Sequence, residues 1–321
     1  MKLSVIVATR NRGGAITPCL DSIAAAFANA KAEAEIVVVD NGSTDGTPSV
    51  VAAWKDAHPV PVQLLSEPRP GKACALNRAL PAARGELLAF TDDDCRFDGD
   101  WVNALLRHDA ADAGLVLRSG RIELGDKTDL PVTVNLSREP RRWTLAANSA
   151  RHDFIGREIY GCNMAFRRAL ADRIGPFDED FGPGSRFFAG EEVDYAYRAY
   201  LDGATLAYDP DMVVYHYHGR KTVAAGRALM CGYMVSWGGI LMKYLFTHPS
   251  LCRPSLWDLR EAAKEIAGGG NGFMPGLGFS HKDKVAWTAR GAVRYAFRRK
   301  DPSARAPREP SLVKRPNCAA R

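Results

Sequence analysis

Three consecutive aspartates, Asp92, Asp93 and Asp94, follow the apolar run ELLAF at residues 86–90. Carboxylates this close repel one another and resist ionising together, so they usually hold a cation or a proton between them. If strand geometry persists, Asp92 and Asp94 point to one side and Asp93 to the other. Divalent cations commonly use one or two carboxylates plus substrate phosphates, so the triplet indicates a site for Mn²⁺ or Mg²⁺. A turn before the helix expected near Trp101 is the alternative interpretation.

The elements that position these carboxylates are predicted to form an α/β fold. Strands are expected over residues 3–9, 35–40 and 86–92, where the apolar runs are continuous, as in parallel strands covered on both faces. Thr-Pro pairs at residues 17 and 47 predict a cap and the start of a helix between strands, so the order β-α-β-α predicts an open parallel sheet. Ligands of such sheets bind beyond the carboxyl ends of the strands. The exits TRNR, DNGSTDGT and DDDC are therefore expected to share one crevice.

Asp40 ends the second predicted strand and precedes a turn rich in Gly and Ser. Acidic residues at this position bind a base or ribose in dinucleotide folds, whereas the alternative is an ordinary turn. The phosphate-loop patterns GxGxxG and GxxxxGK[ST] are absent from the sequence. This absence disfavours NAD chemistry and P-loop chemistry.

Acidic and basic groups recur downstream of a predicted turn and helix at 161–175. Glu191 and Glu192 begin a helix expected over residues 190–203, where acidic side chains are also favoured electrostatically. His216 and His218 lie two apart on a strand expected over 212–218, so they would share a face and offer a third metal ligand or a hydrogen-bond donor. Arg220 and Lys221 follow and are candidates for holding phosphate oxygens.

Six motifs resemble, in order and approximate spacing, those of the family 2 glycosyltransferases, the inverting nucleotide-sugar enzymes with a GT-A fold. They are SVIVATRNR, VVVDNGSTDGT, GKACALNRAL, FTDDDC, GCNMAFRR and GEEVDYAYR, and they cover roughly residues 1–225. The resemblance implies a Rossmann-like, mixed and mostly parallel sheet flanked by helices. It also implies a bacterial polysaccharide-biosynthesis enzyme that moves a sugar from a nucleotide-diphosphate donor to a hydroxyl of a glycan or lipid-linked glycan, using a divalent cation.

The same resemblance assigns roles to individual residues. It implies that Asp92 and Asp94 are the cation-binding ends of a DxD motif. Contacts to the nucleotide-sugar are implied for Thr9, Arg10, Asp40, Lys72, Asn77 and Asp93. Of the two glutamates, Glu192 aligns with the aspartate of a Glu-Asp pair in which one member deprotonates the acceptor, so it is the first candidate for the base and Glu191 the second. A helix N-terminus lowers a carboxylate pKa, so the base is expected to be ionised but weak.

The C-terminal third of the chain is basic. Residues 217–321 hold 19 Lys and Arg against 6 Asp and Glu, whereas residues 1–216 hold 24 against 31. We predict a catalytic domain over 1–225, a helical and membrane-associating extension over 226–300 and a disordered tail over 301–321. The segment 281–300 suits an interfacial helix on anionic lipid, and its alternative is a basic helix packed on the catalytic domain. Nucleic acid is disfavoured because no known binding module surrounds the charges.

The compartment is predicted to be the cytoplasm, with peripheral attachment to the inner face of the cell membrane. The N-terminus MKLSVIVATRNR lacks the pattern of a signal peptide, and seven cysteines without CxxC spacing indicate reduced thiols. Three other functions are weighed against transfer. A sugar-1-phosphate nucleotidyltransferase would need a Gly-rich, basic loop, of which ATRNRGG is a poor version. The Glu-Glu pair also leaves open a scaffold that binds nucleotide-sugar without turnover. A glycoside hydrolase would need two flanking carboxylates but no diphosphate site.

Overall fold

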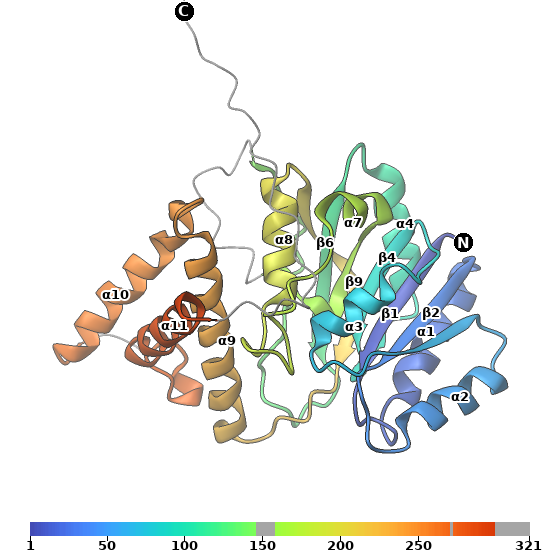
Figure 1. The fold of residues 1–321 in the computed structure, drawn as a ribbon, viewed down its shortest axis with the longest axis horizontal. Coiled ribbons are helices and arrows are strands. Elements are labelled where there is room, and N and C mark those ends of the chain that lie inside the picture. The colour runs from blue at the N-terminus through green and yellow to red at the C-terminus, as the bar shows by residue number, and fades with distance from the viewer. Residues whose placement is uncertain (146–157, 270–271, 299–321) are drawn as a thin grey trace, which may run out of the picture.

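A computed structural model of the protein describes residues 1–145, 158–269 and 272–298, and one mixed sheet runs through its centre (Figure 1). The strand order is β3-β2-β1-β4-β8-β6-β9-β5, with β7 paired to β9. The strands are β1 (Leu3–Thr9), β2 (Ala34–Asp40), β3 (Val62–Ser66), β4 (Leu87–Asp92), β5 (Cys95–Phe97), β6 (Val116–Leu124), β7 (Arg141–Trp143), β8 (Met164–Arg167) and β9 (Thr205–His216). Strands β1 to β4 are parallel, and β8 runs antiparallel to β4 and β6. The predicted α/β class with a mixed, mostly parallel sheet is confirmed.

Helices cover both faces of this sheet. They are α1 (Thr17–Ala30), α2 (Thr47–Ala57), α3 (Lys72–Ala79), α4 (Trp101–Ala111), α7 (Arg168–Ile174) and α8 (Glu191–Leu201). Alternate strand residues separate two cores: Val5 and Val7 pack with α1, α2 and α4, whereas Ile6 packs with α3, α7 and α8. The Thr-Pro signals locate α1 and α2, but each threonine is the first helical residue and the N-caps are Ile16 and Gly46.

Strand register brings three polar exits together at one edge of the sheet. Thr9 pairs with Asp40 across β1 and β2, and Ala8 pairs with Asp92 across β1 and β4. After Asp92 a two-residue turn leads into β5, which pairs with the end of β9. The single crevice expected from the sequence is therefore present in the sheet geometry.

The segment 161–175 differs from the predicted turn and helix. A 3-10 turn (Gly161–Asn163) leads into β8, and α7 begins only at Arg168. The apolar residues of β8 pair with β4 and β6, so they complete the centre of the sheet. The run is four residues long, and its strand conformation depends on neighbours distant in sequence.

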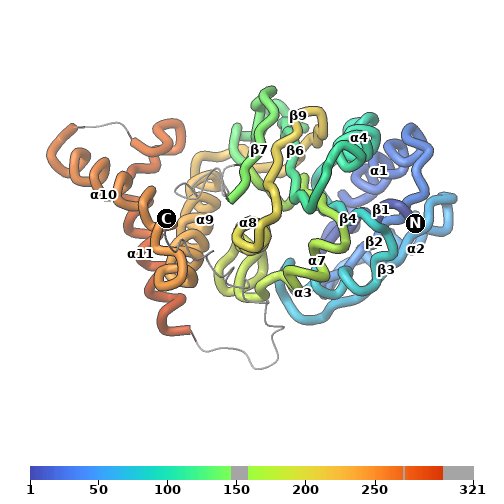
Figure 2. The backbone as a smooth tube through the Cα atoms, turned by 90° about the horizontal axis from the view of Figure 1, so that it is seen from above, coloured from blue at the N-terminus to red at the C-terminus, as the bar shows by residue number. Residues whose placement is uncertain are grey.

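Three further helices, α9 (Val223–Tyr244), α10 (Arg253–Ile266) and α11 (His281–Ala296), stand together at one end of the molecule, beside α8 and opposite β3 (Figures 1 and 2). Short 3-10 turns at Pro249–Cys252 and Pro275–Leu277 connect them. A Cβ on Gly238 of α9 would lie 1.9 Å from Thr288 O of α11, so the two backbones are in direct contact. Among the described residues, none of the helices is both long and apolar enough to cross a membrane.

The helix α9 also joins the core of the sheet domain. Val235, Ile240 and Tyr244 pack in the same hydrophobic cluster as Ile6, and the Tyr244 hydroxyl donates to Asp194 Oδ1 on α8 (2.8 Å). The predicted boundary at residue 225 falls in the first turn of α9. The tail predicted over 301–321 lies outside the described residues.

Candidate active site

The three aspartates at the end of β4 face different partners. Asp92 contacts the Lys72 ammonium, Asp93 Oδ2 accepts from Thr9 Oγ1 (2.7 Å), and Asp94 Oδ1 lies 3.3 Å from His216 Nε2. Arg12 bridges two of them, with Nε 3.1 Å from Asp93 Oδ1 and Nη2 3.2 Å from Asp94 Oδ2. Repulsion within the triplet is thus offset by a separate cation or donor for each carboxylate.

Asp92, Asp94 and His216 form the set that fits a divalent cation. One ligand atom from each lies within 4.8 Å of the other two. Apart from its ion pair with His216, Asp94 Oδ1 is a buried oxygen without a hydrogen-bond partner among the described residues. Two carboxylates and an imidazole suit Mn²⁺ or Mg²⁺, with remaining positions for phosphate oxygens. The residues present therefore fit the predicted cofactor.

Charge and burial set the protonation of this cluster. Burial and the charges of Asp94 and Asp92 raise the pKa of Asp93 to about 6, against the hydrogen bond from Thr9 and the charge of Arg12. Burial would lower the pKa of His216, but its interaction with Asp94 and the other acidic charges raise it to about 9. His216 must lose that proton to act as a metal ligand.

Cys95, Cys162 and His216 form a second buried set within 4.8 Å. Burial raises the pKa of the Cys95 thiol well above its usual range. A thiol must be deprotonated to ligate a metal, so this burial opposes cation binding through Cys95. The oxygen-rich set around Asp92 is consequently the better candidate.

The two candidate bases lie at the start of α8, facing the aspartates. Glu191 is buried, with Oε1 3.3 Å from Lys72 Nζ, whereas Glu192 is half-buried and lines the cleft. Burial and the charge of Glu191 raise the pKa of Glu192 well above its usual range. The expectation of a weak base with a lowered pKa is therefore wrong, because burial and a neighbouring carboxylate outweigh the helix terminus.

Lys72 lies between Asp92 and the two glutamates of α8. Burial would lower its pKa, but the charges of Asp92, Glu191 and Glu192 raise it well above its usual range. The lysine begins α3, and its backbone N donates to Pro183 O (2.9 Å), which fixes the helix start against the loop before α8. Lys72 thus supplies a permanent positive charge at the centre of the cleft.

A cleft of about 430 Å³ contains most of the predicted residues. Its lining includes Thr9, Arg10, Lys72, Asp92, Asp93, Asp94, Glu191, Glu192, His216 and Arg220. Asp40 lies just behind it, buried at the end of β2, where its carboxylate accepts from Ser43 N at 3.3 Å. The neighbouring Asn41 lines the cleft instead.

Besides Asp40, three predicted residues do not line this cleft: His218, Lys221 and Asn77. His218 lies beyond the end of β9: its Nε2 is 3.1 Å from Leu130 O and its Nδ1 accepts from Arg220 N (3.0 Å), so both ring nitrogens are engaged outside the cation cluster. Lys221 is exposed and bonded to Asp126 Oδ2 (2.8 Å). Both assignments to the site are corrected. The strand ends at His216, so the alternation of faces does not continue to His218, and Lys221 pairs with Asp126 outside the cleft.

The assignment of Asn77 to donor binding is also corrected, because its side chain holds the fold together. Its Nδ2 donates to Phe177 O and to Glu179 Oε1, both at 3.0 Å, and its Oδ1 accepts from Phe177 N (2.7 Å). The side chain is fully buried between α3 and the segment after α7. Both ends of the amide are thereby used in holding these segments together.

Sequence reasoning missed Arg12, which bridges Asp93 and Asp94. The signal in the sequence was its place in the same TRNR exit as Arg10. Asp194 and Arg198, four residues apart on α8, form an ion pair (3.0 Å). Both are buried, and Asp194 additionally contacts Lys243 of α9 (2.5 Å).

Comparison with known proteins defines the family. The sequence model of glycosyl transferase family 2 matches residues 4–175, which is more than half of the chain. The chain therefore belongs to glycosyl transferase family 2, and the family predicted from six motifs is confirmed.

Two relatives align over most of the chain. Glycosyltransferase AglE of Haloferax volcanii is 24% identical over 216 residues, which are 67% of this chain and 66% of AglE. Succinoglycan biosynthesis protein ExoM of Rhizobium meliloti is 24% identical over 263 residues, which are 74% of this chain and 80% of ExoM. The chain thus spans just under two thirds of one relative and four fifths of the other.

Solved structures share the fold. The mannosyltransferase PcManGT from Pyrobaculum calidifontis, in complex with GDP-Man and Mn²⁺, aligns with a TM-score of 0.60 and 24% identity over 92% of this chain and 87% of that chain. Residues 1–349 of TarS from Staphylococcus aureus align with a TM-score of 0.55 and 22% identity over 81% of this chain and 75% of that chain. The predicted GT-A fold is confirmed.

Proposed function

We propose that this protein transfers a sugar, with inversion, from a nucleoside-diphosphate sugar to a hydroxyl group of a glycan or lipid-linked glycan in polysaccharide biosynthesis. One observation carries the proposal. The cation set Asp92, Asp94 and His216 and the candidate base Glu192 line the same cleft beyond the carboxyl ends of the strands. A reaction that needs a diphosphate site and a base together fits this arrangement.

The donor side of the cleft combines acidic and basic groups. Asp92, Asp94 and His216 would hold Mn²⁺ or Mg²⁺, which supplies Lewis-acid stabilisation of the diphosphate when bound. Arg12, Lys72 and Arg220 line the same cleft and offer charge-assisted hydrogen bonds to phosphate oxygens. The complex of PcManGT with GDP-Man and Mn²⁺ supports this assignment by similarity of fold.

The base side accounts for the chemistry of transfer. The acceptor oxygen forms a bond to the anomeric carbon, the bond from that carbon to the phosphate oxygen breaks, and the nucleoside diphosphate leaves with the electron pair. Both glutamates line the cleft, and Glu192 takes the acceptor proton because it is half-buried, whereas Glu191 is buried with its carboxylate against Lys72. Its raised pKa makes it a stronger base than an exposed carboxylate.

Attachment to an anionic membrane surface is part of the proposal. Four large apolar residues of α10, Leu256, Trp257, Leu259 and Ile266, are 51% to 75% exposed. Three exposed cations, Arg253, Arg260 and Lys264, lie on the same helix. We call these four apolar and three basic residues the α10 face. Exposed apolar side chains beside basic residues are typical of an interfacial helix on anionic lipid.

The test of the transfer proposal is calorimetric titration of UDP-, GDP-, dTDP- and CMP-sugars, each with and without Mn²⁺. We expect one nucleotide class to bind in a Mn²⁺-dependent manner, and Asp94→Asn to lose that dependence while the protein keeps its fold by circular dichroism. The exposed Asp126→Asn, outside the cleft, is the matched control and should bind like the wild type. Equal binding without metal would overturn the cation assignment.

Turnover separates the enzyme from a scaffold. With the donor identified, release of the nucleoside diphosphate is measured with a panel of glycan and lipid-linked acceptors. Release that requires both an acceptor and Glu192 supports transfer. Metal-dependent binding with no release for any acceptor would favour the non-catalytic scaffold, and incorporation of a sugar 1-phosphate with release of diphosphate from a nucleoside triphosphate would favour the nucleotidyltransferase.

A further inference from the structure

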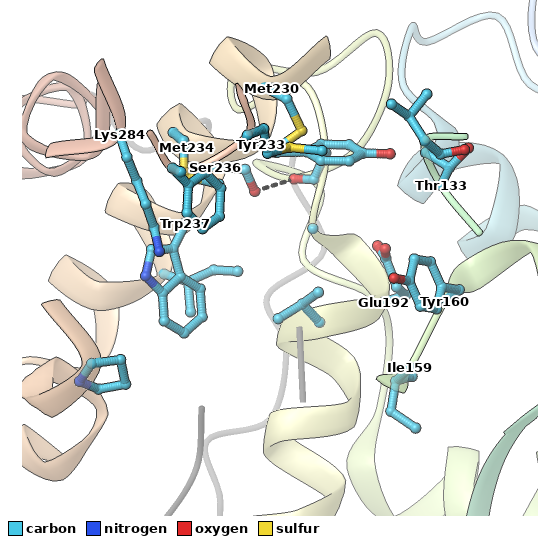
Figure 3. Close-up of a pocket in the computed structure, with 18 of the residues that line it drawn as sticks. Thr133, Ile159, Tyr160, Glu192, Met230, Tyr233, Met234, Ser236, Trp237 and Lys284 are labelled. Carbon is cyan, nitrogen blue, oxygen red and sulfur yellow. Dashed lines mark hydrogen bonds between the residues drawn. The ribbon is translucent and has the colours of Figure 1, made fainter. Parts of the chain in front are cut away.

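A second cavity, of about 370 Å³, lies between the sheet domain and the C-terminal helices. Its wall is mostly apolar and includes Val193, Met230, Met234, Trp237, Ile240 and Phe273. Figure 3 shows Met230, Met234 and Trp237 projecting from α9, across from Ile159 and Tyr160. We call this cavity the apolar pocket. Its size and lining suit a hydrocarbon segment.

The apolar pocket adjoins the cleft that contains the aspartates. The two share the lining residues Thr133, Tyr160, Ala189, Glu192 and Tyr233. Glu192 therefore stands at the junction of the apolar pocket with the cleft that contains the cation set. Figure 3 shows Glu192 across the apolar pocket from Met230 and Met234 of α9. A molecule with its hydroxyl at Glu192 can extend into the apolar pocket without crossing the donor side.

Three polar side chains in the wall beyond this junction, those of Ser236, Asp258 and Lys284, are already paired. The Ser236 hydroxyl donates to Ala189 O (2.5 Å), and Lys284 Nζ donates to Asp258 Oδ1 (2.8 Å). A sugar ring carries several hydroxyls, and each costs free energy when it is buried without a partner. The part of the pocket formed by Met230, Met234 and Trp237 is consequently better suited to an alkyl chain than to a further sugar.

We propose that the apolar pocket binds the hydrocarbon chain of a lipid-linked acceptor while the hydroxyl of the attached sugar lies at Glu192. This inference rests on the proposed function and names its acceptor class. The helix α10 connects the apolar pocket with the α10 face, because Pro254 and Asp258 line the pocket and Leu256, Trp257 and Leu259 belong to the exposed face of the same helix. A lipid anchored in the bilayer under that face would reach the pocket along the same helix.

The inference is tested with n-alkyl β-D-glucosides as probes. Methyl, butyl, hexyl and octyl glucosides are titrated below their micelle concentrations, in the presence of Mn²⁺ and the nucleoside diphosphate that binds. Each buried methylene strengthens binding about fourfold, so octyl glucoside should bind at least roughly tenfold more tightly than butyl glucoside. A flat response to chain length would overturn the inference.

Three variants test whether the increase in affinity with alkyl chain length arises in the apolar pocket. Met234→Gln keeps the side-chain length but adds a polar amide to the pocket, so the gain with chain length should fall below about threefold. Met234→Leu keeps the wall apolar and should preserve the gain. Met242→Gln is the matched control, because Met242 lies on the same helix and is not among the residues that line the pocket. An equal gain in Met234→Gln would place the alkyl chain elsewhere, on the α10 face for example, and overturn the pocket assignment.

Nucleotide binding in the same preparations separates the two proposals. Metal-dependent nucleotide binding with no benefit from the alkyl chain would reject the lipid acceptor and leave the transfer proposal standing. Absence of binding by every nucleotide would reject the transfer proposal whatever the glucosides do. Normal nucleotide binding by Met234→Gln shows that the variant is folded at the donor side.

Discussion

At the scale of single residues, the main feature of the site is that nearby cations offset the charge of five carboxylates, those of residues 92–94, 191 and 192. Lys72 contacts Asp92 and Glu191, and Arg12 contacts Asp93 and Asp94. These cations lower the electrostatic cost of bringing the acids together, so the cleft can assemble before a substrate arrives. His216 contributes a further interaction that changes with protonation.

Replacing His216 or His218 with alanine should have unequal effects on Mn²⁺ affinity. We expect His216→Ala to weaken Mn²⁺ binding by about 10-fold to 100-fold, since it removes one member of the cation set. His218→Ala should leave Mn²⁺ affinity within about threefold of the wild type, because its ring bonds Leu130 O and Arg220 N instead. Calorimetric titration of Mn²⁺ measures both, and the reverse order of effects would contradict the assignment.

The pH dependence of kcat should identify the base. Burial and the charge of Glu191 hold the pKa of Glu192 well above its usual range. The base must be ionised, so kcat should fall as the pH drops through that raised pKa, before the range in which an exposed glutamate titrates. Glu192→Gln should lower kcat by about 100-fold to 10,000-fold without changing nucleotide affinity. A kcat that stays constant down to the pH range in which an exposed carboxylate titrates would contradict the role of Glu192 as the base. A larger loss of kcat in Glu191→Gln, with Glu192→Gln still active, would assign that role to Glu191.

At the scale of elements, the sequence anticipated what is local. The three apolar strands, the helix starts and the three aspartates are encoded by short segments, and register alone then aligns Asp40 and Asp92 with β1. The choice between His216 and His218 depends on where β9 ends against β5, and the burial of Asp194 depends on α9. Such features arise from pairings between distant segments, which a local pattern does not specify.

Contact between α9 and α11 depends on two glycines. A Cβ on Gly238 would lie 1.9 Å from Thr288 O, and one on Gly291 would lie 2.0 Å from Val235 O. We expect Gly238→Ala to lower the free energy of unfolding by about 1 to 3 kcal/mol, measured by urea denaturation.

Gly232→Ala on the same helix is the control for this change. Its nearest neighbour would be Phe188 Cβ at 3.7 Å, an ordinary contact, so the substitution should be neutral or stabilise the helix by up to about 1 kcal/mol. Equal destabilisation by both alanines would show that the close approach is not the cause.

At the scale of the whole molecule, charge and exposed apolar surface gather at the end that carries α10 and α11. In α11, Gly291 and Tyr295 are buried, whereas Val293 is 58% exposed, and Phe297 just beyond the helix is 84% exposed. One part of this helix therefore packs on the rest of the protein and another part is exposed, and its contact with anionic lipid stays a prediction. The N-terminal helices α1 and α2 lie at the opposite end (Figure 2).

Vesicle flotation tests the α10 face. We expect binding to vesicles that contain anionic phosphatidylglycerol, with each basic residue at the surface contributing about 1 kcal/mol, and loss of binding as salt increases. The double variant Trp257→Ser/Ile266→Ser should reduce binding, because it removes apolar surface that enters the bilayer. Leu136→Ser, at a leucine that is 59% exposed on the sheet domain, is the matched control. Equal binding to neutral vesicles, or equal loss in the control, would contradict the prediction.

The order of functional parts along the chain bears on how such proteins diversify. The aspartates lie within the family match at residues 4–175, whereas Glu192, the α9 wall of the apolar pocket and α10 all lie after it. Under the proposed function, substitutions in the later segment, apart from those at His216 and Arg220, are expected to alter the acceptor while leaving the nucleotide-binding edge intact. New polysaccharide linkages could therefore arise by drift in one half of a gene, and chimeras joined near Gly175 would be a practical route to altered products.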